Sequence, residues 1–124
     1  MTVALHLPAQ PEYAALARTM AVSIAARCEL TYDRVEDVRL AIDEAFNQVV
    51  LNAPVDAEIV CTFIEEVGAL EFMVQSSTLL EDALPTDTFS WTVLSALADE
   101  LHTSNIDGVL TVVARVQEQQ NEAA

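Results

Sequence analysis

Apolar residues alternate with other residue types at the start of the chain, at Val3, Leu5 and Leu7. This period of two predicts a first strand that ends at Pro8. Pro11 then suits the first position of a helix, because its fixed backbone angle already matches a helix. Further apolar residues follow at helical spacing: Tyr13, Leu16, Met20 and Ile24.

A second helical pattern begins after Thr31, a residue type that favours the N-cap position, with Asp33 in the first turn. We expect this helix to end near Asn52, because Pro54 disfavours helical geometry at the residue before it. Its apolar face comprises Val35, Val38, Ile42, Ala45, Phe46 and Val49.

A β-hairpin is expected next. Residues 58–64 are rich in β-branched and apolar types, and apolar residues alternate again over residues 70–74. Gly68 lies between the two runs, as in a hairpin turn. Residues 76–88 combine turn residues and acids without a regular pattern, so we expect a loop there.

A third helix and a last strand complete the pattern. Ser90 can cap this helix. The Asp107-Gly108 pair is a strong turn signal, and alternating apolar residues over residues 110–116 predict the strand. The expected buried side of the third helix comprises Trp91, Leu94, Leu97, Ala98 and Leu101.

The elements follow one another in the order β-α-α-β-β-α-β. This order predicts an α+β fold, a two-layer sandwich in which a mixed, mostly antiparallel sheet carries helices on one face. The chain has 124 residues, of which 52% are hydrophobic, enough for one compact core. We expect a single domain over residues 1–116 and a frayed tail over residues 117–124.

Several residue types limit the location and the chemistry of the chain. The apolar runs are shorter than the ~20 residues of a membrane helix, and the N-terminus lacks the basic and apolar regions of a signal peptide. Cys28 and Cys61 lack metal-ligand spacing, which suggests buried thiols in a reducing cytoplasm. His6 and His102 have no neighbouring ligands, so no metal site is expected. The short apolar runs lead us to expect no membrane contact.

The charge of the chain is strongly negative. It contains five arginines, no lysine and twenty acids, for a net charge of -15. Such a chain repels phosphate backbones, so direct nucleic acid binding is not expected. Two interpretations remain open: a solvated acidic surface, or a surface that attracts a basic protein partner.

Three segments resemble those of a known family. They are residues 11–18 (PEYAALAR), residues 36–44 (EDVRLAIDE) and residues 89–99 (FSWTVLSALAD). In their order and spacing they are similar to anti-sigma-factor serine kinases of the RsbW and SpoIIAB type. The resemblance implies the Bergerat fold of the GHKL ATPases and a cytoplasmic homodimer that sequesters a sigma factor. It also implies a STAS-domain anti-anti-sigma factor, which releases the sigma factor and which the kinase phosphorylates on a serine.

The catalytic helix of that family carries a Glu, an Asn one turn later and a His two turns later. Glu44 matches the Glu, which in the family acts on the attacking hydroxyl. Gln48 stands at the magnesium-binding Asn position and Asn52 at the His position. Glu44 lies away from the core face between two leucines, so it suits a pocket or partner contact, or is an ordinary solvated Glu.

The remaining nucleotide positions of the family also differ here. Ser76 aligns with the adenine-reading Asp, Thr78 with a following glycine, and Thr88 and Ser90 with glycines that cradle phosphates. Threonine is strained where a phosphate loop turns its N–H groups inward, and no lysine can neutralise a triphosphate. We therefore expect no cofactor, with ATP and magnesium kept as the alternative that the family implies.

Arg18 aligns with a first-helix arginine that in the family contacts both the sigma factor and its antagonist. The other interpretation is a surface arginine paired with a nearby acid. We expect Trp91 to lie in the core and not to contact a partner. The sequence thus leaves three hypotheses: an anti-sigma factor that needs no nucleotide, an active serine kinase, and an interaction module of the same fold without a sigma partner.

Overall fold

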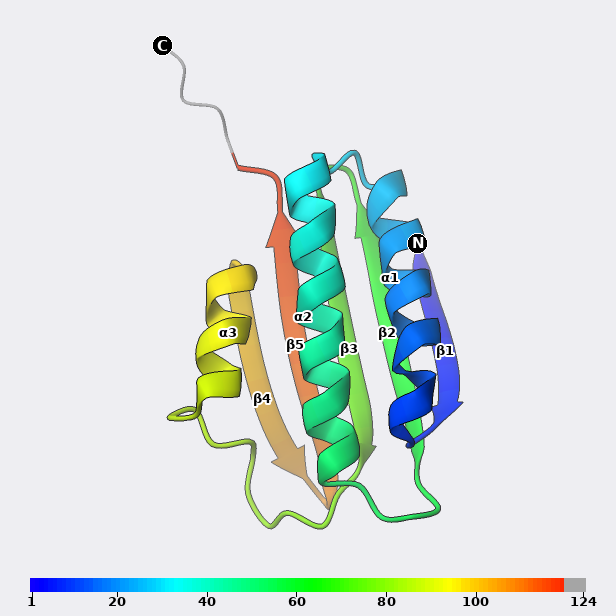
Figure 1. Ribbon diagram of the computed structural model, residues 1–124, viewed down its shortest axis with the longest axis vertical. Helices are drawn as coiled ribbons and strands as arrows, with labels where there is room; N and C mark the ends of the chain where they lie inside the picture. Colours follow the sequence, from blue (N-terminus) through cyan, green and yellow to red (C-terminus); the bar gives the residue numbers. More distant parts are fainter. Residues whose placement is uncertain (120–124) are drawn as a thin grey trace.

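The computed structural model describes residues 1–119, where it contains five strands and three α-helices (Figure 1). A short 3-10 helix (Pro11–Tyr13) leads into the first α-helix, consistent with a helical start at a proline. The elements are β1 (Thr2–Pro8), α1 (Ala14–Arg27), α2 (Tyr32–Leu51), β2 (Glu58–Glu66), β3 (Ala69–Ser77), α3 (Phe89–Leu97), β4 (Glu100–Ile106) and β5 (Val109–Gln117).

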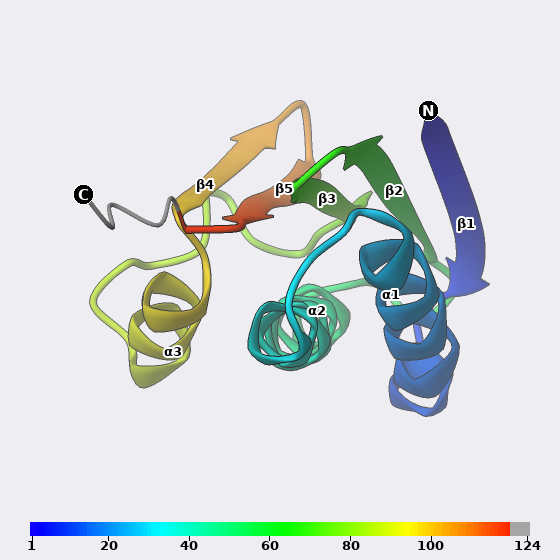
Figure 2. The ribbon, with the colours of Figure 1, turned by 90° about the horizontal axis from the view of Figure 1, so that it is seen from above.

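The strands form one sheet in the order β1-β2-β3-β5-β4, and every pairing among them is antiparallel. All three α-helices cover the same face of the sheet, with α2 in the middle, and no helix of residues 1–119 covers the other face (Figure 2). The expected α+β sandwich is confirmed. The sheet is antiparallel throughout, however, and not mixed.

The strand β4 departs from the sequence pattern. The apolar spacing predicts a third helix through Leu101, but α3 ends at Leu97 and Ala98 is already extended. Leu101 instead pairs with Ala114 of β5. β4 is an edge strand with few apolar residues, so its alternation is weak. The element order is therefore β-α-α-β-β-α-β-β.

The start of α3 also differs from the expectation. Thr88, not Ser90, occupies the N-cap position, and its hydroxyl oxygen accepts a hydrogen bond from the Trp91 N–H at 3.1 Å. Ser90 lies within the first turn. Trp91 is partly buried and packs against the core, as the core interpretation predicts.

The start of α2 is held by a contact from the far end of the chain. Thr31 has the extended backbone of an N-cap, but its side chain does not cap the helix. Its N–H donates instead to a carboxylate oxygen of Glu118 at 2.8 Å. Glu118 also donates its own N–H to the Gly68 carbonyl at 2.7 Å, which joins the β2–β3 turn to the end of β5.

The core lies between the helices and the sheet. α1 buries Ala17, Ala21 and Ala25 completely, and such small side chains let two helices approach closely. α2 lies over β3 and β5. It buries six residues that are each at most 1% exposed: Val38, Ala41, Ile42, Ala45, Phe46 and Val49.

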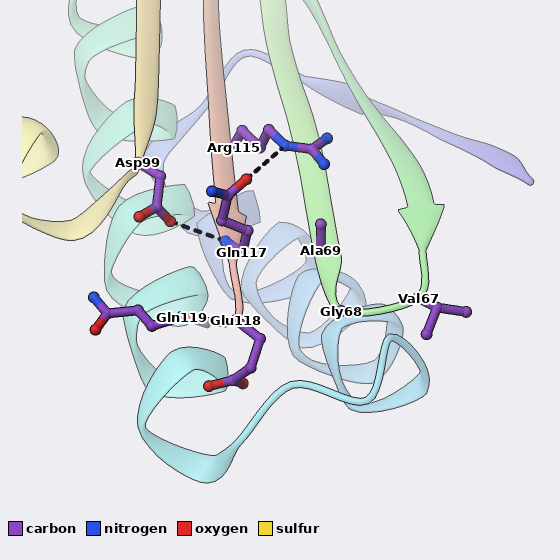
Figure 3. A pocket seen from close by; sticks show the side chains of 8 residues that line it. All are labelled: Val67, Gly68, Ala69, Asp99, Arg115, Gln117, Glu118 and Gln119. Carbon is purple, nitrogen blue, oxygen red and sulfur yellow. Dashed lines mark hydrogen bonds between the residues drawn. The ribbon is translucent and has the colours of Figure 1, made fainter. Parts of the chain in front are cut away.

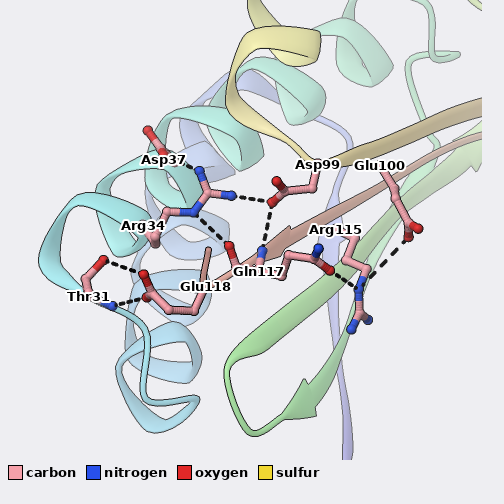
Figure 4. A network of polar contacts seen from close by, with 8 residues as sticks. All are labelled: Thr31, Arg34, Asp37, Asp99, Glu100, Arg115, Gln117 and Glu118. Carbon is pink, nitrogen blue, oxygen red and sulfur yellow. Dashed lines mark hydrogen bonds and ion pairs between the residues drawn. The ribbon is translucent and has the colours of Figure 1, made fainter. Parts of the chain in front are cut away.

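Arg34 ties the first turn of α2 to the ends of β5 and α3 (Figure 4). Its Nε donates to the Gln117 carbonyl at 3.0 Å, and one Nη donates to Asp37 at 2.9 Å. The other Nη contacts Asp99, which also accepts the Gln117 N–H at 2.9 Å. The Arg34 side chain is 13% exposed, so water competes weakly for these contacts.

The expected tail is ordered at its start. Gln117 is the last residue of β5, and Glu118 makes the contacts described above. Residues 120–124 lie outside the described part of the chain. Among the helices of residues 1–119, none combines the length and the apolar character needed to cross a membrane.

We expect Arg34→Ala to lower the free energy of unfolding by about 2 kcal/mol, because it removes charged hydrogen bonds in a poorly hydrated position. Chemical denaturation followed by circular dichroism measures this change. Arg39→Ala is the matched control on the same helix, since within residues 1–119 the one ion pair of Arg39 is with the half-exposed neighbour Glu36. Equal midpoints for the two variants would contradict a special role for Arg34.

Candidate functional site

Three of the family positions lie along the last turns of α2. Glu44 and Gln48 are half-buried, and the Gln48 amide points toward a Glu44 carboxylate oxygen at 3.5 Å. The Asn52 side-chain amide donates to the Gln48 carbonyl at 2.8 Å. The neighbouring Leu40 and Leu51 are exposed. Glu44 therefore lies on an accessible, partly apolar side of the helix, as its sequence position predicts.

The end of α2 is joined to the loop that follows β3. The Asn52 carbonyl accepts the Leu79 N–H at 2.7 Å and the Thr78 hydroxyl at 3.0 Å. The same hydroxyl oxygen accepts the Leu80 N–H at 3.2 Å, and the Thr78 N–H donates to the Gly108 carbonyl at 3.0 Å. The structure therefore brings Asn52 and Thr78 into direct contact.

Further contacts hold the loop over residues 78–88 against the sheet and core. The Asn105 amide of β4 donates to the carbonyls of Leu80 and Asp82, at 2.9 and 3.0 Å. The Leu84 N–H donates to the Thr103 hydroxyl at 3.4 Å, and the Leu84 side chain is 6% exposed within the core. The part of this loop from residue 78 to residue 84 is therefore attached to the domain, whereas Pro85, Thr86 and Asp87 are exposed.

The other family positions have separate local roles. Ser76 is 4% exposed and donates its hydroxyl to the next carbonyl, that of Ser77, at 2.9 Å. Thr88 caps α3, and Ser90 has a buried hydroxyl oxygen without a hydrogen-bond partner within residues 1–119. Within residues 1–119, no hydrogen bond joins any of these three residues to Glu44 or Gln48.

Arg18 on α1 donates to Asp43 on α2 at 2.7 Å. About a third of each side chain is exposed, at 35% and 36%. Arg18 is therefore an arginine paired with a nearby acid, which is one of the two interpretations of its sequence position. Its exposure still leaves part of the guanidinium accessible to a partner.

All five arginines of the chain form ion pairs with carboxylates. Besides the pairs of Arg18 and Arg34, these join Arg27 to Glu65, Arg39 to Glu36, and Arg115 to Glu66 and Glu100. Hydrogen bonds from Arg39 and Arg115 hold the pKa of Glu36 and of Glu66, respectively, below the ordinary value. Each cation therefore has a carboxylate beside it, although Arg18, Arg27 and Arg39 remain at least a third exposed.

These residues do not fit a bound magnesium nucleotide. The Asn52 side-chain amide donates within its own helix, the Thr78 hydroxyl holds the loop against the Asn52 backbone carbonyl, and the Ser76 hydroxyl is bonded to its own strand. The chain has no lysine, and every arginine already faces a carboxylate. Phosphoryl transfer depends on positioning and on charge stabilisation. Within residues 1–119, no three side chains of metal-binding type cluster together.

Two surface cavities lie elsewhere. One of about 500 Å³ lies between the β2–β3 turn and the end of β5, beside Asp99 and Arg115 (Figure 3). Another of about 200 Å³ lies on β3, β4 and β5, next to His102 and Val113. Arg115 lines both cavities and is already paired with Glu66, so neither offers a free cation to an anionic ligand.

The polar residues that hold the fold together are not visible in the sequence. Arg34 contacts Asp99 and Gln117, which lie 65 and 83 positions away. Asn105 clamps a loop more than twenty positions before it. The Arg34–Asp37 and Glu36–Arg39 pairs, each three residues apart on α2, do have a spacing that helical periodicity could have suggested.

Comparisons with known proteins agree with the fold and the motifs. The chain is 34% identical to the anti-sigma-F factor RsbW of Mycobacterium tuberculosis over 103 residues, which cover 82% of this chain and 60% of that protein. It is 33% identical to the serine-protein kinase RsbW of Listeria monocytogenes over 78 residues, 60% of this chain and 50% of that protein. The chain belongs to the RsbW family.

A solved structure has the same fold as this RsbW-type domain. It is the crystal structure of the RsbU and RsbW domains of a Mycobacterium tuberculosis protein, with a TM-score of 0.77 and 16% identity. The match covers 98% of this chain and 33% of that one. The chain spans about 60% of the length of the first curated relatives. No family model matches the RsbW-type sequence.

We expect Thr78→Gly, which places the family glycine in this RsbW-type domain, to lower the free energy of unfolding by about 2 kcal/mol. The variant loses two hydrogen bonds of the hydroxyl and gains backbone freedom in the unfolded chain. Amide hydrogen exchange should then accelerate over residues 79–84. Thr78→Ser is the control because it keeps the hydroxyl, and it should retain slow exchange. Unchanged exchange in Thr78→Gly would show that the loop is held by other contacts.

Proposed function

We propose that the chain is an anti-sigma factor. It binds an alternative bacterial RNA polymerase sigma factor in the cytoplasm and keeps it from the polymerase, and a STAS-domain anti-anti-sigma factor counters it. The observation that carries this proposal is the 34% identity, over 82% of this chain, to a protein named anti-sigma-F factor RsbW. The shared two-layer fold supports it.

The distribution of charge supports a basic protein as the partner. The five arginines are all paired, while acids such as Glu12, Asp56 and Asp82 are exposed without an ion pair within residues 1–119. Sigma factors carry basic DNA-binding regions, and complementary charge accelerates association of two proteins. Association that does not depend on salt would remove this part of the proposal.

A serine-protein kinase is the second candidate. It is favoured by the Listeria monocytogenes relative of that name and by Glu44, which keeps the family carboxylate on an accessible side of α2. The hydrogen bonds that hold residues 78–84, among them the bond of the Thr78 hydroxyl to the Asn52 backbone carbonyl, weigh against it. We therefore propose that binding is retained and that the kinase activity has been lost.

A homodimer is part of the same proposal. The sheet face opposite the helices carries the half-buried apolar residues Val60, Met73 and Val113. They alternate with the core residues Cys61, Val74 and Val112 and so point away from the helices. A second copy could cover this face, as expected of the family.

We expect Arg18→Glu to weaken sigma factor binding at least ~10-fold, because arginine contacts often carry a large share of binding energy at an interface. Its thermal midpoint should stay close to that of the parent protein, since the Arg18–Asp43 pair is partly exposed. Isothermal titration with purified candidate sigma factors and STAS proteins measures the binding.

The double variant Arg18→Asp with Asp43→Arg is the matched control. It restores an ion pair between α1 and α2 but moves the cation to the other helix. Sigma factor binding should remain weak in this variant. Full recovery of binding would mean that the pair acts through the fold, and a screen in which no sigma factor binds would favour an interaction module of another kind.

We expect no phosphate-sized mass gain when the chain is incubated with Mg-ATP and a STAS-domain partner. The physical reason is that the Asn52 amide and the hydroxyls of Ser76, Thr78 and Thr88 are hydrogen-bonded within the fold. Intact mass spectrometry of the STAS partner gives the answer. A mass gain that disappears in Glu44→Ala would establish the kinase instead.

A further inference from the structure

At one end of the molecule α2 and β3 finish and β4 turns into β5 (Figure 1). The segments at this end contain five exposed apolar residues. We call this the loop end, defined by residues 51–57, 78–82 and 105–109. Its apolar side chains are from 39% to 87% exposed, which is unusual for so many large residues in one region. They are Leu51, Val55, Leu79, Ile106 and Val109.

Hydrogen bonds between the segments hold these residues near one another. The Leu79 N–H reaches the Asn52 carbonyl at 2.7 Å, next to Leu51. The preceding N–H, that of Thr78, reaches the Gly108 carbonyl at 3.0 Å. Ile106 and Val109 are paired across the β4–β5 turn. The loop end is therefore a fixed surface, which lowers the ordering cost of binding.

The same surface is acidic and contains no arginine or lysine. The five arginines lie at other positions and are each paired with a carboxylate. The C-terminal end of α2 also points here without a basic residue in its last turn, which adds partial negative charge. The exposed acids of the loop end are Asp56, Glu81, Asp82 and Asp107.

Charge decides which occupant suits this surface. A second copy placed symmetrically would bring acids against acids. Anionic lipid and nucleic acid are repelled for the same reason. A protein segment with an apolar stripe flanked by lysines or arginines matches both features of the surface, because its apolar side chains cover the exposed leucines and isoleucine while its cations face the acids.

We propose that the loop end is a docking surface for a basic amphipathic segment of a protein partner. It is distinct from Arg18, which lies on α1 and outside the three segments. The proposal does not require that the partner be a sigma factor. It assigns a role to side chains that the family motifs leave without one.

The test uses a synthetic amphipathic helix of leucine and lysine as the probe, and a second peptide in which glutamate replaces each lysine. Nuclear magnetic resonance titration of isotope-labelled protein follows both. The basic peptide should shift amides of residues 51–57, 78–82 and 105–109 and bind more weakly as salt rises. The acidic peptide should not bind. Shifts centred elsewhere, or equal binding of both peptides, would overturn the proposal.

Two variants locate the binding further. Leu79→Ser with Ile106→Ser should weaken the basic peptide at least ~10-fold, because apolar burial is lost. Asp82→Asn with Asp107→Asn should weaken it about 3- to 10-fold. Asn suits residue 107 because its backbone has a positive φ of 53°.

Matched controls come from the opposite end of the molecule. Val67 is 85% exposed at the β2–β3 turn, and Glu29 and Asp33 are exposed acids near the start of α2. Val67→Ser, and Glu29→Gln with Asp33→Asn, should leave peptide binding unchanged. If these controls weaken peptide binding as much as the loop-end variants do, the assay reports only net charge or non-specific hydrophobic binding. That result would refute the proposal that the loop end is the docking surface.

Discussion

Val38, Ile42, Phe46 and Val49 of α2 lie almost fully buried over the middle of the sheet. Each such side chain contributes about 1.5–3 kcal/mol when it is removed from water. Since α1 and α3 pack on the two sides of α2 (Figure 2), the position of α2 determines where both of them lie. It also determines which residues of α2 remain accessible, among them Glu44 and Gln48.

The central position of α2 makes its two ends important for different reasons. At its start, Arg34 and the Thr31–Glu118 contact join the helix to the last strand, so that segments distant in sequence close one end of the sandwich. At its finish, the Asn52 carbonyl takes two hydrogen bonds from the loop after β3. The loop is thus held by a threonine hydroxyl at a position where the family has a glycine.

The small number of arginines determines the charge of the surface. Five arginines are too few to balance twenty acids, and each is placed where it joins two elements or braces one helix. Acids without an ion pair within residues 1–119, such as Glu12, Asp56 and Asp82, face solvent. A domain with this net negative charge repels phosphate groups and attracts a basic protein. This charge balance supports the proposal that the domain binds a protein partner and has lost phosphoryl transfer.

The sequence by itself determined the fold class, most elements and the family. Strong periodicity placed α2 and the hairpin strands, and Gly68 and the Asp107-Gly108 pair marked both hairpin turns. These signals are local, since they depend on residues a few positions apart. The weak edge strand β4 and the cap at Thr88 were missed because pairing with β5 and local hydroxyl geometry decide them.

Only the tertiary structure decided how the family positions are used. It joined Asn52 to Thr78 and left Ser76, Thr88 and Ser90 in separate surroundings. It paired Arg18 with Asp43 and Arg34 with Asp99, and it brought Leu51, Leu79 and Ile106 to one end. The physical reason is that hydrogen bonds and ion pairs act over a few ångströms in space, and residue spacing along the chain does not reveal which distant segments come that close.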